Sequence, residues 1–178
     1  EISIEDNPGY NFKLDKPVDF ITLNPGDFYK IGDYEFEIID LKGHTPGHIG
    51  LYDKKHKIMF SGDTVLDPIT PNITFWGFEY KNILATYMET LNKVKDMDIN
   101  YLFTSHRRII DNPEERIQEI LDHHEERLQE ILDSMTLGEK TTIREVSSKI
   151  TWRIRAKDWD DFPKAQERFS TGETMSHM

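Results

Sequence analysis

Three side chains able to bind a metal ion stand at the ends of three different predicted strands. His44 lies in the turn Gly43-His44-Thr45-Pro46-Gly47-His48, where two glycines and a proline would hold the imidazole on rigid backbone. Asp63 and His106 follow two later apolar runs. Imidazole and carboxylate groups are ligands of zinc and related ions, and the chain has no cysteine that would supply a thiolate. The residue types therefore indicate a metal site built from histidine and aspartate.

A predicted hairpin brings the first two of these side chains together. Residues 49–52 and 57–60 are mainly apolar and flank the polar stretch 53–56, which is typical of two antiparallel strands joined by a short turn. The first strand leaves the His44 turn and the second returns toward Asp63. We therefore expect both residues at the same end of the sheet.

A helical crossover is predicted to bring His106 to the same edge. Apolar residues recur at intervals of three and four over residues 81–95, which predicts an amphipathic helix. Residues 101–103 then form a short apolar strand. Because a strand reached through a helical crossover runs parallel to the strand before it, His106 should emerge beside His44 and Asp63.

These motifs resemble those of a known family. The turn 43–48, followed by Phe60-Ser61-Gly62-Asp63-Thr64, resembles the third and fourth metal motifs of the metallo-β-lactamase superfamily, and His106 resembles the fifth. The resemblance implies an α/β (α+β) fold, the second half of an αββα sandwich followed by a small helical, winged-helix-like subdomain. It also implies two zinc ions, or sometimes iron or manganese, at the sheet edge. His44 would bind the first ion, His106 would bind the second, and Asp63, the candidate catalytic carboxylate, would bridge both.

Three further residues near these motifs are candidates for supporting roles. His48 is predicted to orient its loop by hydrogen bonding rather than to bind an ion. Arg107 and Arg108, directly after His106, are candidates for binding an anionic part of a substrate, although surface arginines are common. The remaining histidines have a structural or surface explanation and are not assigned to the site: His56, His123, His124 and His177.

The sequence also departs from the family pattern. Lys42 stands where the family usually has proline, and Thr104-Ser105-His106-Arg107 replaces the usual Pro-Gly-His-Gly. The first family motif, His-x-His-x-Asp-His, has no counterpart in the 178 residues. A catalytic zinc usually has three protein ligands and one open position. Since the chain offers one histidine and one shared aspartate per ion, we expect it to lack half the ligands and to be inactive alone.

The remaining pattern predicts two units. Residues 1–136 are assigned to the sandwich portion and residues 137–178 to a truncated winged-helix-like helical unit, because Leu137-Gly138-Glu139 interrupts the helical pattern. The other predicted elements are strands at 19–23, 28–31 and 34–41, a long helix at 113–135 capped by Asn112, and helices at 142–150 and 162–178.

Composition restricts the partners of the chain. A formal net charge of -11 disfavours a surface that binds nucleic acid broadly. The only basic and aromatic cluster, residues 152–157, is followed at once by Asp158, Asp160 and Asp161. No apolar run is long enough to span a bilayer and no signal peptide opens the chain, so we expect no membrane partner and a cytoplasmic location.

Two functional hypotheses follow. The first is hydrolysis of an ester, thioester, lactone, amide or phosphodiester of a small-molecule substrate by a metal-bound hydroxide, as the family resemblance implies. The second is a nucleic-acid or protein binding module in which the degenerate sheet edge is structural. A His-x-His-x-Asp-His motif encoded before Glu1 would favour the first. Half a sandwich would also expose an apolar sheet face, which favours a homo-oligomer.

Overall fold

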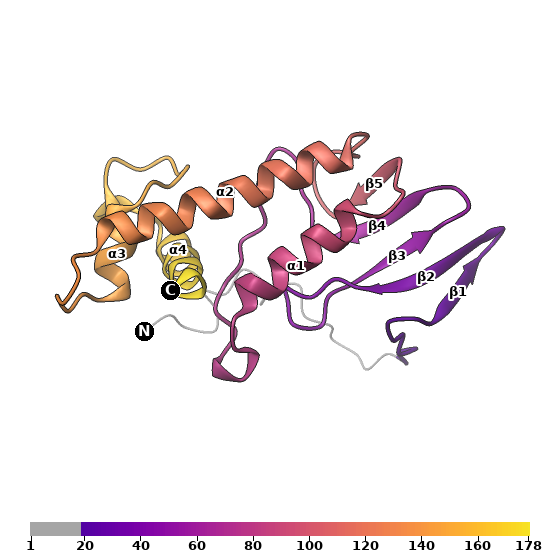
Figure 1. Ribbon diagram of the computed structural model, residues 1–178, viewed down its shortest axis with the longest axis horizontal. Coiled ribbons are helices and arrows are strands. Elements are labelled where there is room, and N and C mark those ends of the chain that lie inside the picture. The colour runs from indigo at the N-terminus through magenta and orange to yellow at the C-terminus, as the bar shows by residue number, and fades with distance from the viewer. Residues whose placement is uncertain (1–18) are drawn as a thin grey trace.

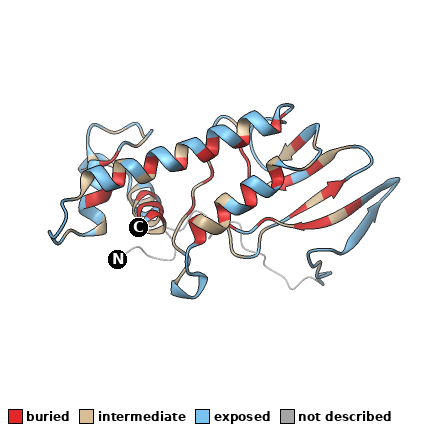
Figure 2. Cartoon of the chain, viewed as in Figure 1, coloured by how far each residue is buried: buried red, intermediate tan, exposed pale blue. Residues whose placement is uncertain are grey.

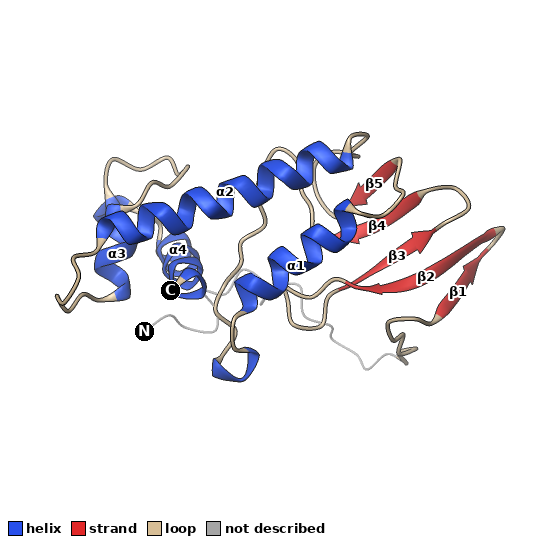
Figure 3. Cartoon of the chain, viewed as in Figure 1, coloured by secondary structure: helices blue, strands red, loops and turns tan. Residues whose placement is uncertain are grey.

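A computed structural model of the protein describes residues 19–178, which form one five-stranded sheet and four α-helices (Figures 1 and 3). The strands lie in chain order, with the first four antiparallel and β5 parallel to β4. They are β1 (Phe28–Ile31), β2 (Tyr34–Asp40), β3 (Ile49–Asp53), β4 (Ile58–Gly62) and β5 (Tyr101–Thr104). The helices are α1 (Ile83–Lys95), α2 (Pro113–Ser134), α3 (Ile143–Lys149) and α4 (Lys164–His177). This mixed α/β architecture confirms the predicted fold class.

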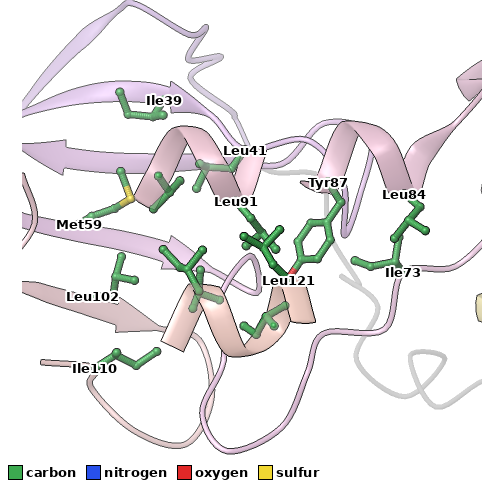
Figure 4. Packing of buried hydrophobic residues seen from close by; sticks show 14 of the residues in the cluster. Ile39, Leu41, Met59, Ile73, Leu84, Tyr87, Leu91, Leu102, Ile110 and Leu121 are labelled. Atoms are coloured by element: carbon green, nitrogen blue, oxygen red, sulfur yellow. The ribbon is translucent and has the colours of Figure 1, made fainter. Parts of the chain in front are cut away.

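One face of the sheet packs against α1 and α2. Ile39, Met59 and Leu102 project from β2, β4 and β5 into a single apolar cluster, which Leu91 of α1 and Leu121 of α2 complete (Figure 4). Buried residues follow this face of the strands and the inward stripe of each helix in Figure 2. Removal of this apolar surface from water is the main force that holds the two helices on the sheet.

The opposite face of the sheet carries a row of aromatic side chains. Phe60 of β4 stacks on Phe103 of β5 with ring centroids 4.9 Å apart, and it meets Phe36 of β2 edge to face at 5.7 Å. Phe60 is 41% exposed. The homo-oligomer remains a prediction, and this face is the surface through which two copies would contact each other.

Two local predictions are wrong. Residues 19–23 form no strand: Phe20 and Ile21 are 78% and 76% exposed, and β1 pairs only with β2 within the described chain. An apolar run without a partner strand lacks the hydrogen bonds and the packing that stabilise a strand. Asn112 does precede α2, but its side chain donates to Glu115 and does not cap the helix.

The other elements agree with the predicted ones to within about two residues, the usual uncertainty of helix and strand ends. The structure starts α1 at Ile83 rather than at Lys81, because Lys81 has a φ of 45° and the Asn82 side chain accepts from the Ala85 N–H, which caps the helix. Both expected C-terminal helices are present, while residues 137–178 contain no strand. The winged-helix-like character and the boundary at 136/137 remain predictions.

The C-terminal helices pack on the far half of α2. Ile131 of α2, Val146 of α3 and Ile150 form a second, smaller apolar cluster. A capping box between Thr142 and Glu145 starts α3. Figure 1 shows α3 and α4 at the end of α2 that lies away from the strands. The long helix is thus shared by both parts of the chain.

A buried pair of histidines joins α2 to α4. The His177 Nδ1–H donates to the Glu173 carbonyl oxygen at 2.7 Å, so its Nε2 accepts from the His124 Nδ1–H at 3.0 Å. This arrangement requires the His177 ring to be neutral, because its Nε2 must keep a lone pair. Burial lowers the pKa of both histidines, and their mutual proximity further lowers that of His124. Each ring would resist protonation while the fold is intact.

We expect acid to destabilise the protein through this pair. The pKa of an ordinary histidine is 6.5, and in the folded protein the pKa of His124 and of His177 is lower. Below pH 6.5 the unfolded chain therefore binds more protons at these two positions than the folded protein does. The free energy of unfolding decreases as the pH falls for this reason. Burial raises the pKa of Glu173 to about 7, which contributes in the opposite direction and reduces the slope. The thermal unfolding midpoint, measured from pH 7.5 to pH 5, should therefore decrease. His124→Gln should flatten this dependence, and equal slopes in the two proteins would contradict the assignment.

Candidate metal centre

The structure brings His44, Asp63 and His106 together at one edge of the sheet. The His44 Nε2 lies 3.8 Å from Asp63 Oδ2, and the His106 Nε2 lies 3.5 Å from Asp63 Oδ1. Two ligand atoms held by one zinc ion at about 2.0–2.2 Å in a tetrahedral arrangement lie roughly 3.4 Å apart. Each imidazole therefore faces a different carboxylate oxygen at a distance close to that of two ligands sharing an ion.

The carboxylate itself has the chemistry of a site that takes a cation. Asp63 Oδ1 is buried, yet no described residue donates a hydrogen bond to it. Such an atom normally has a partner. At the same time, residues 19–178 contain no group of three or more His, Asp or Glu side chains that could hold an ion by itself. The residues present fit part of a two-ion site, with one imidazole for each oxygen of a shared carboxylate.

The His44 loop is fixed by contacts with α1. Gly43 has a φ of 145°, and a Cβ there would lie 2.5 Å from the Cβ of Tyr87, so only glycine allows the backbone this close to the helix. Thr90 of α1 also donates to the Lys42 carbonyl oxygen at 2.7 Å. The glycine of the metal motif is thus required by the approach of a helix.

His44 is held in one tautomer. A carbonyl oxygen can only accept, so the 2.9 Å contact between His44 Nδ1 and the Asn72 oxygen is a donation from the ring. Burial lowers the pKa of His44, while the Asn72 contact and the Asp63 charge oppose that change. The ring is therefore neutral, with its Nε2 lone pair on the side of Asp63. Metal-binding histidines usually have this second hydrogen bond.

The Asp63 loop is fixed by two contacts with neighbouring residues. The buried Tyr87 hydroxyl donates to the Thr64 carbonyl oxygen at 2.6 Å. The His48 Nε2–H donates to the Ser61 carbonyl oxygen at 3.1 Å, so this nitrogen is occupied by the backbone of β4. The predicted role of His48 in orienting the loop is consistent with this contact.

The His106 loop is closed by its own backbone. Leu102 and Ile110 exchange two hydrogen bonds across it, and the Ser105 N–H donates to the Gly62 carbonyl oxygen at 3.1 Å. The Thr104 hydroxyl bonds the carbonyl oxygens of His106 and Arg108. These contacts tie the His106 loop directly to the residue before Asp63.

The two predicted substrate-binding arginines lie beside His106. Arg107 is exposed and has a φ of 75°. Arg108 is mostly exposed and forms an ion pair with Asp67 at 3.4 Å. His56, by contrast, bonds Asp53 at the turn between β3 and β4, away from the ligand-bearing end of the hairpin.

Two residues that contact the site carry no signal in the sequence. Asn72 accepts from His44, and the Trp76 indole donates to the His44 carbonyl oxygen at 3.1 Å. Both lie between Asp63 and α1 in a segment without periodicity or a recognisable turn motif. Their role follows only from the path of the chain.

Taken together, these observations describe an α/β protein with two histidines and one aspartate gathered at a sheet edge. The chain belongs to the metallo-beta-lactamase superfamily, because the model of that superfamily matches residues 4–106, more than half of the chain.

Solved structures support the same fold. A metallo-beta-lactamase family protein from Thermus thermophilus superposes with a TM-score of 0.76 at 23% identity, over 94% of this chain and 50% of that one. A beta-lactamase domain protein from Burkholderia ambifaria gives a TM-score of 0.78 at 25% identity, over 90% and 46%. The match extends over the C-terminal helices as well as the sheet.

Curated relatives are similar over shorter stretches. The beta-lactamase-like protein 2 homolog of Caenorhabditis elegans is 26% identical over 155 residues, 83% of this chain and 50% of that protein. Hydroxyacylglutathione hydrolase GloC of Haemophilus influenzae is 31% identical over 71 residues, 40% and 34%. Acyl-coenzyme A thioesterase MBLAC2 of Gallus gallus is 44% identical over 45 residues, 25% and 16%. The chain thus spans half or less of the length of these relatives.

We expect zinc binding to depend on Asp63. Asp63→Ala removes the carboxylate that both imidazoles face, so the zinc affinity measured by titration calorimetry should fall at least roughly 100-fold, because even partners one step removed from a metal are worth about 10–100-fold. Asp67→Ala, which removes a neighbouring carboxylate paired with Arg108, is the matched control and should change the affinity little. Unchanged zinc binding in Asp63→Ala would remove the site assignment.

Proposed function

We propose that this chain provides half of the active site of a metal-dependent hydrolase. His44 and His106 would each bind one of two ions, zinc in the first instance, and Asp63 would bind both. The observation that carries the proposal is the single carboxylate with one imidazole on each oxygen, at 3.8 Å and 3.5 Å. Membership of the metallo-beta-lactamase superfamily supports the same assignment.

The names of the relatives favour a thioester as the substrate class. One similar protein is named a hydroxyacylglutathione hydrolase and another an acyl-coenzyme A thioesterase. Their substrates differ in the carrier but share a thioester carbonyl. Both carriers are anionic, so the exposed Arg107 and Arg108, which directly follow His106, would bind such a group. Esters, lactones, amides and phosphodiesters are the wider set of candidate substrates.

The geometry accounts for how the chain would serve this reaction. Divalent ions, when bound, would supply an acidified water and polarise the carbonyl under attack. His44 keeps its Nε2 lone pair free because its proton is held on Nδ1 by the Asn72 carbonyl oxygen. Asp63 lies between the two imidazoles, and its loop is fixed by Tyr87. The protein's contribution is to fix these donors before an ion arrives.

The same chemistry limits what the chain would do alone. One imidazole and a share of one carboxylate per ion are fewer than the three protein ligands of a typical catalytic zinc. We therefore propose that the 178 residues bind metal weakly and hydrolyse little without the His-x-His-x-Asp-His element that the superfamily places first.

The test compares the 178-residue chain with the product of its entire reading frame, each supplied with zinc. We expect the latter to hydrolyse a hydroxyacylglutathione or an acyl-coenzyme A, followed by release of the free thiol. His106→Ala should lower kcat/KM by roughly 100-fold or more, because it removes a ligand of the second ion.

Arg153→Ala, an exposed variant in the C-terminal unit, is the control and should retain activity. A zinc-loaded protein that cleaves none of the candidate ester, thioester, lactone, amide or phosphodiester substrates would contradict the proposal and favour a binding module.

A further inference from the structure

We propose that α4, in the C-terminal unit, is a positioning element for the metal ligand His44. It would act through the segment formed by residues 72–76, which lies between α4 and the His44 loop. The inference rests on the proposed function only in taking His44 as a ligand. The contacts that carry it involve no metal.

The segment is bound along α4 by a series of hydrogen bonds. The Asn72 side-chain amide donates to Glu173 Oε2 at 2.6 Å and to the Phe169 carbonyl oxygen at 3.3 Å. The Ser176 hydroxyl donates to the Ile73 carbonyl oxygen. The Phe75 N–H donates to the Gly172 carbonyl oxygen at 3.1 Å. Two turns of α4 therefore set the position of this segment.

The other side of the segment holds His44 by two contacts. The Asn72 carbonyl oxygen accepts from the His44 Nδ1–H at 2.9 Å, and the Trp76 indole donates to the His44 carbonyl oxygen at 3.1 Å. Asn72, which α4 holds directly, thus fixes the His44 ring, and Trp76, the residue after the attached Phe75, fixes the His44 backbone. A shift of Asn72 would move the acceptor that selects the tautomer.

Glu173, the residue of α4 that accepts from the Asn72 side chain, is itself buried. Its side chain is 10% exposed, and its second oxygen lies 3.9 Å from the Nε of Arg127 on α2. Arg127 is also buried, donates to the Thr151 carbonyl oxygen and lies over the Trp152 ring at 4.3 Å. Because a buried carboxylate needs partners, Asn72 is held where it satisfies Glu173. This attachment therefore involves α2 as well as α4.

Gly172 lies where α4 and residues 72–76 approach each other closely. A Cβ at this position would lie 2.2 Å from Thr74 Oγ1 and 3.5 Å from Thr74 Cβ. Alanine is a better helix former than glycine, so Gly172→Ala should not weaken α4 itself. The added methyl group would instead collide with the Thr74 hydroxyl, and we expect residues 72–76 to shift away from the helix. Removing the Thr74 hydroxyl would relieve that clash, since the remaining contact is an ordinary one.

The experiment reads the His44 tautomer by NMR of the chain labelled with ¹⁵N in histidine, without metal. We expect the wild type to show His44 with its proton on Nδ1. Gly172→Ala should lose this signature and show a mixture of tautomers, while its helical circular dichroism is retained. The double variant Thr74→Ala/Gly172→Ala should restore the wild-type signature.

Gln166→Ala is the matched control, because it is an exposed helix-favouring change on the same helix, and it should leave His44 unchanged. Asn72→Ala is a second variant that keeps the backbone acceptor and removes only its attachment to α4, and it should also mix the tautomers. A folded Gly172→Ala or Asn72→Ala with the wild-type His44 signature would overturn the inference.

Addition of zinc separates this inference from the proposed function. If zinc perturbs the His44 Nε2 signal of the wild type, the ligand assignment is supported. A wild type that keeps the Nδ1–H tautomer and does not respond to zinc would count against the metal site. The variants would still decide whether α4 positions the ring.

Discussion

The contacts of Tyr87 hold in place the two loops that carry His44 and Asp63. Its ring, fully buried among the core residues in Figure 4, touches the backbone of Gly43, and its hydroxyl donates to the Thr64 carbonyl oxygen at 2.6 Å. One side chain of α1 therefore supports both the loop of His44 and the loop of Asp63. Because α1 is itself held by the apolar core, the free energy of packing fixes the distance between an imidazole and a carboxylate.

The sheet supplies the rest of the geometry through its connections. The hairpin of β3 and β4 returns the chain to the edge it left, and the crossover through α1 makes β5 parallel to β4. Three loops thus meet at one edge, and hydrogen bonds such as Ser105 to Gly62 join them. A site built in this way needs no ligand to assemble its donors, although the described residues supply only part of a two-ion set.

The C-terminal unit is connected to this edge by polar contacts as well as by apolar ones. The buried histidines of α2 and α4, the Glu173 carboxylate and Arg127 lie at the junction, where each buried polar group needs a specific partner. Polar contacts of this kind fix relative position more sharply than apolar packing does, because they depend on direction as well as on distance. This explains why α4 is able to carry a positional constraint toward His44.

The order of the strands around the site, the parallel strand and the convergence of His44, Asp63 and His106 could all be predicted, because they follow from local patterns and from rules of connection between neighbouring elements. The sequence did not predict that residues 19–23 lack a strand, since a strand requires a partner that composition does not reveal. Nor did it reveal Asn72, Trp76 or α4 as neighbours of His44. Asn72 and Glu173 are 101 residues apart in the chain, and only the packing of α4 on α2 brings their side chains within hydrogen-bonding distance.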